Sequence, residues 1–104
     1  MIYDLAFGAK KRLSIDFQDG LDELPSGESI SGTVSTIFVD DGDLVVTDFA
    51  PTGAIASYDV DAASVTKRRL YKVKNVATTT PGDFKIPRTN FFHVMRHVPT
   101  VSTV

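Results

Sequence analysis

The most closely spaced carboxylates in the chain are Asp40, Asp41 and Asp43, which surround Gly42. Carboxylate oxygens at this spacing are ligands that a calcium ion can use. A calcium loop of the EF-hand type also needs a bidentate glutamate at about its twelfth position, and the chain has none there. The same residues are typical of a tight turn, because aspartate accepts backbone N–H groups and glycine adopts positive φ. We therefore predict a turn and no metal site.

The two histidines, His93 and His97, are four residues apart. In a helix this spacing would place both on one face, but in a strand it separates them by roughly 13 Å. The chain has no cysteine, and the nearest carboxylate in sequence is Asp83, so we expect no zinc site. We expect no cofactor either, because neither glycine-rich phosphate-binding motif is present.

Serine and threonine are plentiful, but no G-x-S-x-G motif places a serine on a nucleophile turn. Paired carboxylates such as Asp22 and Glu23 are common in any chain with 13 acidic residues. Acid–base catalysis would also need one of them in a dry cleft. We therefore predict no catalytic residue and no enzymatic activity.

Charge and hydropathy argue against two classes of partner. Basic residues 10–12 and 67–69 flank aromatic strands, a pattern that can bind single-stranded nucleic acid. The net charge of −2, however, lacks the basic surplus that such binding uses. The apolar runs are far shorter than the ~18 residues needed to span a bilayer. Residues 1–9 contain Asp4 and are too short for a signal peptide. We expect a soluble, non-exported protein that binds neither nucleic acid nor membrane.

The strongest β-strand patterns lie in residues 68–98. Residues 70–79 are rich in Val, Thr and Tyr, residues 91–95 are aromatic and β-branched, and residues 81–83 between them are turn-forming. Because strand side chains alternate, each strand should present one face to a core. The residues predicted to share these faces are Tyr71, Val73, Asn75 and Ala77 on the first strand and Asn90, Phe92 and Val94 on the second. We predict that this pair is the centre of the fold.

Shorter alternating runs predict further strands at residues 13–17, 27–39, 44–48 and 55–60. In the second run, alternation places Ile30, Val34 and Phe38 on one face and Ile37 on the other. The turn at residues 40–43 predicts a hairpin between the second and third runs. Seven or so short strands separated by turn residues, without a long helical pattern, indicate an all-β sandwich.

A chain of 104 residues is one domain, residues 1–104, with its core at about residues 13–95. Residues 1–12 should be an N-terminal arm or edge strand, and residues 96–104 a C-terminal tail. Both ends carry apolar side chains that are costly to leave in water. Either these complete the sandwich or they bind neighbouring subunits by adding a strand. The candidate interface residues are Ile2, Tyr3, Leu5, Phe7, Val98, Val101 and Val104.

Four short motifs follow one another along the chain: L-x-I-D-F at residues 13–17, G-E-S-I-S at 27–31, G-D-L-V-V at 42–46 and L-Y-K-V-K-N-V-A-T-T-T-P-G-D at 70–83. This order resembles the small immunoglobulin-like β-sandwich proteins of tailed bacteriophages, which are fibre-to-tail adaptors or other virion proteins. In that family an aspartate–aromatic pair precedes a G-E-T/S-I strand start, and a Y-x-V-x-N strand runs into a T-T-x-x-G turn. The matching positions here are Asp16, Phe17, residues 27–30, Tyr71, Val73 and Asn75.

The chain departs from this pattern in two places. The family usually has a glycine-rich turn before the tyrosine strand, where this chain has residues 66–69, Thr-Lys-Arg-Arg. It usually has Gly-Arg after the T-T turn, where this chain has Pro-Gly-Asp at 81–83 and a longer insertion to Arg88. Both departures bear on which partner the protein would bind.

The resemblance implies an antiparallel immunoglobulin-like sandwich of about seven strands with extended terminal arms. It implies a non-enzymatic structural or adaptor subunit of a virion, made in the host bacterial cytoplasm. Its expected partners are neck, tail or fibre proteins and further copies of itself in a ring. The alternative is a carbohydrate- or receptor-binding module, in which Tyr58, Tyr71 and the aspartate-rich turn would line a site.

Overall fold

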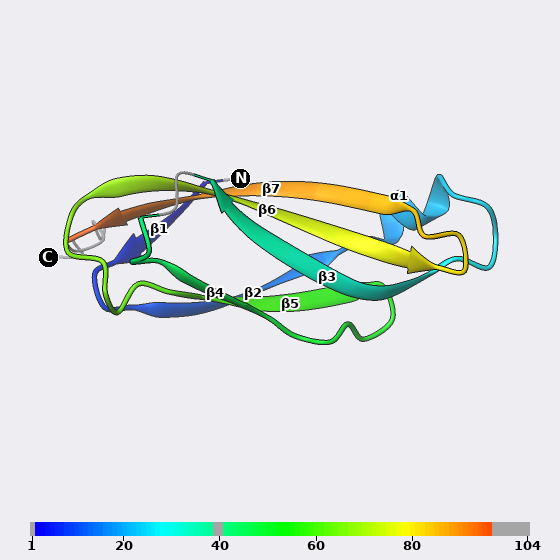
Figure 1. Ribbon diagram of the computed structural model, residues 1–104, viewed down its shortest axis with the longest axis horizontal. Coiled ribbons are helices and arrows are strands. Elements are labelled where there is room, and N and C mark those ends of the chain that lie inside the picture. Colours follow the sequence, from blue (N-terminus) through cyan, green and yellow to red (C-terminus); the bar gives the residue numbers. More distant parts are fainter. Residues whose placement is uncertain (1, 39–40, 97–104) are drawn as a thin grey trace, which may run out of the picture.

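The computed structural model describes residues 2–38 and 41–96, which form two packed β-sheets (Figure 1). One sheet has the strand order β1-β7-β6-β3 and the other has the order β2-β5-β4. The elements are β1 (Ile2–Ala6), β2 (Lys10–Asp16), α1 (Gln18–Asp22), β3 (Ser29–Phe38), β4 (Val45–Asp48), β5 (Ile55–Asp61), β6 (Arg69–Thr80) and β7 (Lys85–Met95). The predicted all-β sandwich of about seven strands is confirmed.

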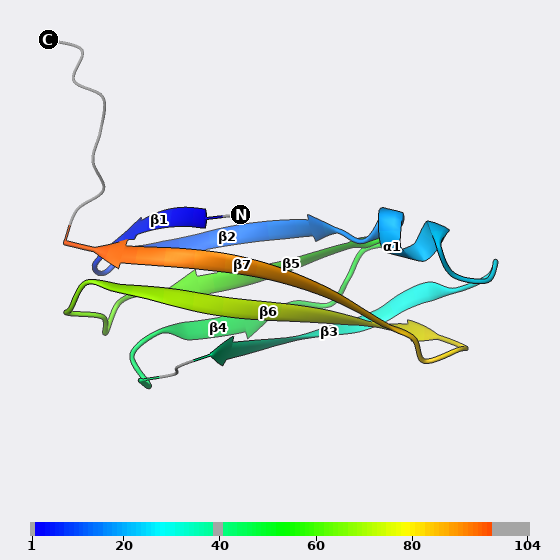
Figure 2. The ribbon, with the colours of Figure 1, turned by 90° about the horizontal axis from the view of Figure 1, so that it is seen from above.

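The strand order is that of an immunoglobulin fold. Strands β3, β6 and β7 correspond to C, F and G of that fold, and β2, β5 and β4 correspond to B, E and D. Among the described strands every pairing is antiparallel except that of β1, which runs parallel to β7 with Leu5 opposite Val94. Figure 2 shows β1 alongside β7 at one edge of the four-stranded sheet. The N-terminal stretch is therefore an edge strand of the sandwich.

The predicted central pair, β6 and β7, supplies much of the core. Tyr71 lies opposite Phe92 in the register, and both side chains are buried, as the alternation predicted. Phe92 stacks on Tyr3 with ring centroids 5.5 Å apart and meets Tyr58 of the other sheet edge-on at 6.4 Å. Phe17, directly after β2, is also fully buried and belongs to a second cluster beside α1. Buried aromatic rings thus pack between the two sheets, with Tyr58 and Phe92 in one cluster and Phe17 in the other.

The side chains of β3 do not point to the sides of the sheet that strict alternation predicts. Its pairing with β6 shifts after Ile30, so that Ser31 forms a bulge. One extra residue moves every later side chain to the opposite face. Ile30 is buried, but Val34 is 64% exposed, Phe38 is 41% exposed, and Ile37 packs against the core. The predicted shared face of Ile30, Val34 and Phe38 is therefore wrong.

The predicted hairpin between β3 and β4 is also wrong. Strand β3 pairs with β6 and β4 pairs with β5, so the connection between them crosses from one sheet to the other. On this connection the carboxylate of Asp41 accepts hydrogen bonds from the Tyr71 hydroxyl at 2.7 Å and from Arg69 at 3.3 Å. These contacts hold the connection against the start of β6 instead of closing a tight hairpin. Asp40 lies outside the described residues.

Candidate functional site

Three connections gather at one end of the sandwich, the right-hand end of Figure 1. They are the β2–β3 connection with α1, the β4–β5 connection, and the β6–β7 turn. The buried ring of Phe17 anchors the start of α1, and the Asp16 carboxylate accepts the N–H of Gln18 at 2.9 Å. Loops at the end of a rigid sandwich are a common place for binding sites, so this loop end is a candidate site.

Helix α1 packs unusually close to β7. A Cβ atom on Gly20 would lie 2.6 Å from Cγ2 of Ile86, a distance that real Cβ contacts do not reach. Ile86 is buried, and a β-branched side chain has few alternative rotamers. The position therefore requires glycine for this close approach. The absence of a side chain at Gly20 lets the helix lie directly on the strand.

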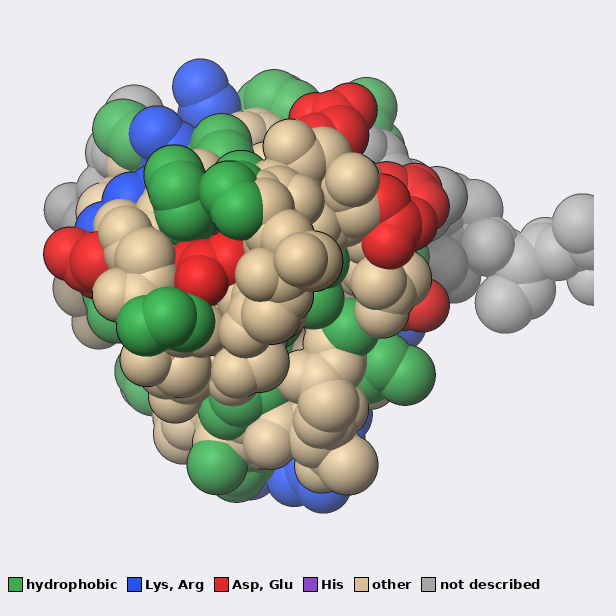
Figure 3. Space-filling model, turned by 90° about the vertical axis from the view of Figure 1, so that its right-hand side faces the viewer, with side chains coloured by type: hydrophobic (Ala, Val, Ile, Leu, Met, Phe, Trp, Pro, Cys, Tyr) green, Lys and Arg blue, Asp and Glu red, His purple; other side chains and the backbone are tan. Residues whose placement is uncertain are grey.

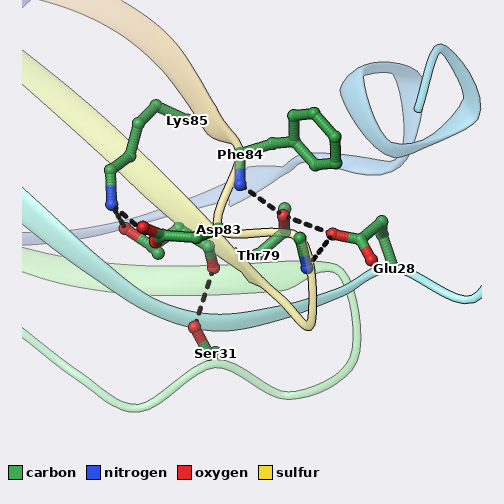
Figure 4. A network of polar contacts seen from close by, with 8 residues as sticks. Glu28, Ser31, Thr79, Asp83, Phe84 and Lys85 are labelled. Carbon is green, nitrogen blue, oxygen red and sulfur yellow. Dashed lines mark hydrogen bonds and ion pairs between the residues drawn. The ribbon is translucent and has the colours of Figure 1, made fainter. Parts of the chain in front are cut away.

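A single carboxylate fastens the β6–β7 turn to the start of β3 (Figure 4). Oε1 of Glu28 accepts hydrogen bonds from the Thr79 hydroxyl at 2.9 Å and from the Gly82 N–H at 2.8 Å. The Thr79 oxygen accepts in turn from the N–H of Phe84 at 3.0 Å. The motif at residues 27–31 and the end of the motif at residues 70–83 therefore meet in space.

Three further contacts hold the same turn from its other side (Figure 4). Nζ of Lys85 lies 3.1 Å from Oδ1 of Asp83 and donates to the Thr78 hydroxyl at 3.0 Å. The Ser31 hydroxyl donates to the Thr78 carbonyl oxygen at 3.0 Å. Asp83 has a positive φ of 55°, which aspartate tolerates better than most residues. The turn predicted at residues 81–83 is confirmed, and it is firmly held.

Shallow depressions lie on the two sides of α1. The larger, of about 450 Å³, has acidic groups on the helix side and basic groups on β7; the smaller, of about 370 Å³, opens toward the start of β3. Residues that line the larger depression are Asp19, Gly20, Glu23, Leu24, Lys85, Ile86, Pro87 and Arg88. Figure 3 faces this end and shows acidic side chains beside apolar ones. Such a surface can hydrogen-bond a polar ligand.

The aspartates of the β3–β4 connection lie at the opposite end of the sandwich. Asp41 also accepts the N–H of Asp43 at 3.0 Å. Its pKa is lowered, chiefly by the hydrogen bond from the Tyr71 hydroxyl. Within residues 2–38 and 41–96, no group of three or more His, Cys, Asp or Glu side chains is arranged to hold a metal ion. In the described chain Asp41 acts as a hydrogen-bond acceptor within the fold.

The predicted N-terminal interface residues occupy different positions in the fold. Leu5 is 4% exposed and lies in the core, and Tyr3 and Phe7 pack against that core. Ile2 is 66% exposed. The first three therefore complete this chain's own sandwich, and Ile2 remains accessible to a partner. The C-terminal candidates, Val98, Val101 and Val104, lie outside the described residues.

The tyrosines that the carbohydrate-binding alternative would use are buried. Tyr58 and Tyr71 both point into the core. Asn90 donates to the Tyr58 hydroxyl at 3.0 Å, and burial raises the pKa of Tyr58 to about 12. Burial likewise raises the pKa of Tyr71, with the neighbouring Asp41 adding to the shift. The prediction that these two rings line a surface site is wrong.

An ion pair on the outer face of the three-stranded sheet was not predicted. The Asp59 side chain, almost fully buried, accepts from Nε and Nη2 of Arg12 at 2.7 and 3.1 Å, and Nζ of Lys10 lies 3.7 Å away. The Phe49 ring lies under the Arg12 guanidinium, 4.5 Å from its Cζ. The Arg12 hydrogen bond lowers the pKa of Asp59. Alternation places Asp59 on this face, but no local pattern names a partner 47 residues away.

Comparison with known proteins adds no family assignment: no family model matches the chain, and no curated protein matches it either. The described residues contain no helix long and apolar enough to cross a membrane.

Proposed function

We propose that this chain is a non-enzymatic structural or adaptor subunit of a tailed-phage virion, which joins neck, tail or fibre components. The motif resemblance supports the virion class. The structural observation that carries the proposal is the exposure of large apolar side chains on a well-packed sandwich. Ile2, Val34, Leu70 and Val45 are each more than half exposed. Groups of such side chains are typical of surfaces that bind other proteins.

In this proposal the sandwich acts as a rigid spacer. The Glu28 network and the long β6–β7 pairing hold the two ends of the sandwich at a defined separation. Neighbouring subunits would then bury the exposed apolar side chains, including Ile2, together with Val98, Val101 and Val104. Repetition around a symmetry axis multiplies weak contacts into a stable ring.

A nonsense codon in the gene, in the phage that carries it, tests the virion assignment. We expect particles that lack a neck, tail or fibre component by electron microscopy, and we expect the protein in purified wild-type particles by mass spectrometry. Normal infectious particles made without the protein would contradict the proposal. A chain ending at Arg96 keeps every described strand, so its failure to enter particles would assign the contact to residues 97–104.

A carbohydrate- or receptor-binding module remains the second candidate, now at the loop end. The observation that favours it is the depression of about 450 Å³ beside α1, where Asp19 and Glu23 face Lys85 and Arg88. Charged and polar groups of this kind can fix a sugar by hydrogen bonds. A glycan array with the wild-type protein and with Arg88→Ala tests this function. Binding that the substitution removes would support it, and an array without any bound glycan would exclude it.

A further inference from the structure

The outer face of the four-stranded sheet carries a row of side chains that crosses all four strands. The register places Ile2 of β1, Phe91 of β7, Lys72 of β6 and Phe38 of β3 side by side. The Lys72 ammonium lies 5.0 Å from the centroid of the Phe38 ring. Leu70, two residues before Lys72 on β6, points to the same side of the sheet and is 52% exposed. We call this surface the docking face.

The apolar character of the docking face continues toward the loop end. Val34 of β3 lies opposite Val76 of β6, which in turn lies opposite Pro87 of β7. Val34 is strongly exposed, because the bulge at Ser31 turns it outward. Among residues 2–38 and 41–96, four large apolar side chains are more than half exposed, and three of them (Ile2, Val34 and Leu70) lie on this one face.

The outer face of the three-stranded sheet is different. Its rows pair Lys10 with Asp61 and Arg12 with Asp59, and the hydroxyls of Ser14 and Ser57 lie 2.9 Å apart. Polar groups on this face therefore satisfy one another or face water. The same face also carries Val45 opposite Asp61 and Ile55 opposite Asp16, which are 51% and 47% exposed. Polar pairs therefore occupy the middle of this face, whereas on the four-stranded sheet Phe91 and Phe38 flank Lys72 in the middle of the row.

The sheet edges are poorly suited to association by strand addition. Strands β1 and β4 are short, with five and four residues. Strand β2 begins with three basic residues, Lys10, Lys11 and Arg12. The β3 edge has the bulge at Ser31, and the Asp48 carboxylate accepts the Ser35 N–H at 2.8 Å. Short strands, charges and bulges are the features that prevent edge pairing, so a partner would use a face.

We infer that the docking face is the contact between two copies of this chain. The inference deepens the proposed function and rests on it, since it names the surface through which the subunit would self-associate. Strands β3, β6 and β7 have 10, 12 and 11 residues and β1 has five. At about 3.3 Å per residue and about 4.8 Å per strand the face covers roughly 600 Å², the lower end of the roughly 600–1,000 Å² per partner of standard interfaces.

The charges on the docking face also fit a second copy. Lys72 and Lys74 on β6 supply ammonium groups. Asp4 on β1, about half exposed and 3.8 Å from Nδ1 of His93, supplies a carboxylate. A face that carries both signs can be complementary to itself, as an isologous contact requires. The apolar side chains of the face then supply the desolvated centre of the interface, with the Lys72 ammonium over the Phe38 ring.

Sedimentation velocity over roughly a hundredfold range of protein concentration tests the contact. We expect the wild-type chain to form a dimer and Leu70→Glu to raise its dissociation constant by at least about tenfold. Val34→Glu should act in the same direction. Val45→Glu is the matched control, since it adds the same charge at a similarly exposed valine of the other sheet. Circular dichroism confirms that each variant is folded.

Three results would overturn the inference. The wild-type chain could stay monomeric at the highest concentration, or the dimer could persist in both Leu70→Glu and Val34→Glu. The third is that the control Val45→Glu weakens the dimer as much as these two variants do. Complementation of the nonsense phage separates this outcome from the virion proposal. If Leu70→Glu restores normal particles, the docking face is wrong as a virion contact and the virion assignment stands. If particles never contain the protein, the virion assignment fails while a measured dimer stands.

Discussion

Glu28 shows how one side chain can position a whole turn. Its Oε1 atom accepts both a hydroxyl and a backbone N–H, and Thr79 passes the contact on to Phe84. Hydrogen bonds to an ionised carboxylate are stronger than those between neutral groups. Thr79 is buried, so water cannot easily replace the lost acceptor.

Replacing Glu28 by alanine should therefore destabilise the fold. We expect Glu28→Ala to lower the free energy of unfolding by about 1–3 kcal/mol, because two donors lose their acceptor. Urea unfolding monitored by circular dichroism measures the change. Glu23→Ala removes an exposed carboxylate of the same connection and should change stability by less than about 0.5 kcal/mol. Equal losses in both variants would refute the role of the network.

Tyr58 makes stability depend on alkaline pH. Its pKa is raised to about 12 by burial, against about 10 in an unfolded chain. Since the folded state favours the neutral phenol, this stabilisation is complete below about pH 10 and is lost as the pH rises toward about 12. Denaturant unfolding across this range should show falling stability. In Tyr58→Phe, stability should fall less steeply with rising pH, and the fall that remains should come from Tyr71. If the substitution leaves the pH dependence of stability unchanged, Tyr58 does not cause it.

At the scale of elements, close contacts decide which residues are allowed. Helix α1 and strand β7 touch at Gly20 and Ile86, where a Cβ atom has no room. In an unhindered helix, glycine to alanine is stabilising by up to about 1 kcal/mol. Because of the contact with Ile86, we expect the same substitution at Gly20 to be destabilising.

We expect Gly20→Ala to cost about 1–3 kcal/mol, the usual cost of overpacking. Chemical denaturation of Gly20→Ala, Ile86→Ala and the double variant forms a mutant cycle. The cost of Gly20→Ala should shrink when Ile86 is already alanine, because the colliding atoms are then absent. A stabilising Gly20→Ala in the wild-type background would show that the helix can move away without cost.

The bulge in β3 is an element-scale event with a molecular consequence. It lets Ile30 join the core beside Phe17 while Val34 turns outward. Without the extra residue at Ser31, strict alternation would bury Val34 together with Ile30. The exposure of Val34 and Phe38 on the docking face therefore depends on the one extra residue, Ser31, in the bulge.

At the scale of the whole molecule, strand β1 closes the sandwich. Its parallel pairing with β7 places Leu5 in the core and Tyr3 on the Phe92 ring. This arrangement makes the N-terminus a structural element, with Ile2 left at the surface.

Two substitutions on this one strand test that arrangement. Leu5→Ala should lower the free energy of unfolding by about 2–5 kcal/mol, the usual cost of removing a buried leucine side chain. Ile2→Ala, at an exposed position of the same strand, should change it by less than about 0.5 kcal/mol. Thermal or urea unfolding of the isolated chain measures both. Similar small effects would mean that β1 detaches in solution and behaves as an arm.

The β6–β7 hairpin, its inward face and its turn could be predicted because they depend on local alternation and turn chemistry. Tyr71, Val73 and Phe92 illustrate this, since each is buried as its position in the pattern indicates. The candidate interface was only partly predictable, because the apolar character of Ile2 and Leu5 does not say which of them the same chain will cover.

The all-β class, the approximate number of strands and the central hairpin follow from the residue pattern alone, because they depend on interactions between near neighbours. The packing of the two sheets sets the remaining features: the β3 bulge, the separation of β3 from β4, and the contacts of Glu28 with Thr79 and of Arg12 with Asp59. Those partners lie 51 and 47 residues apart. Such contacts form when whole sheets stack, and no period along the chain encodes which distant side chains then meet.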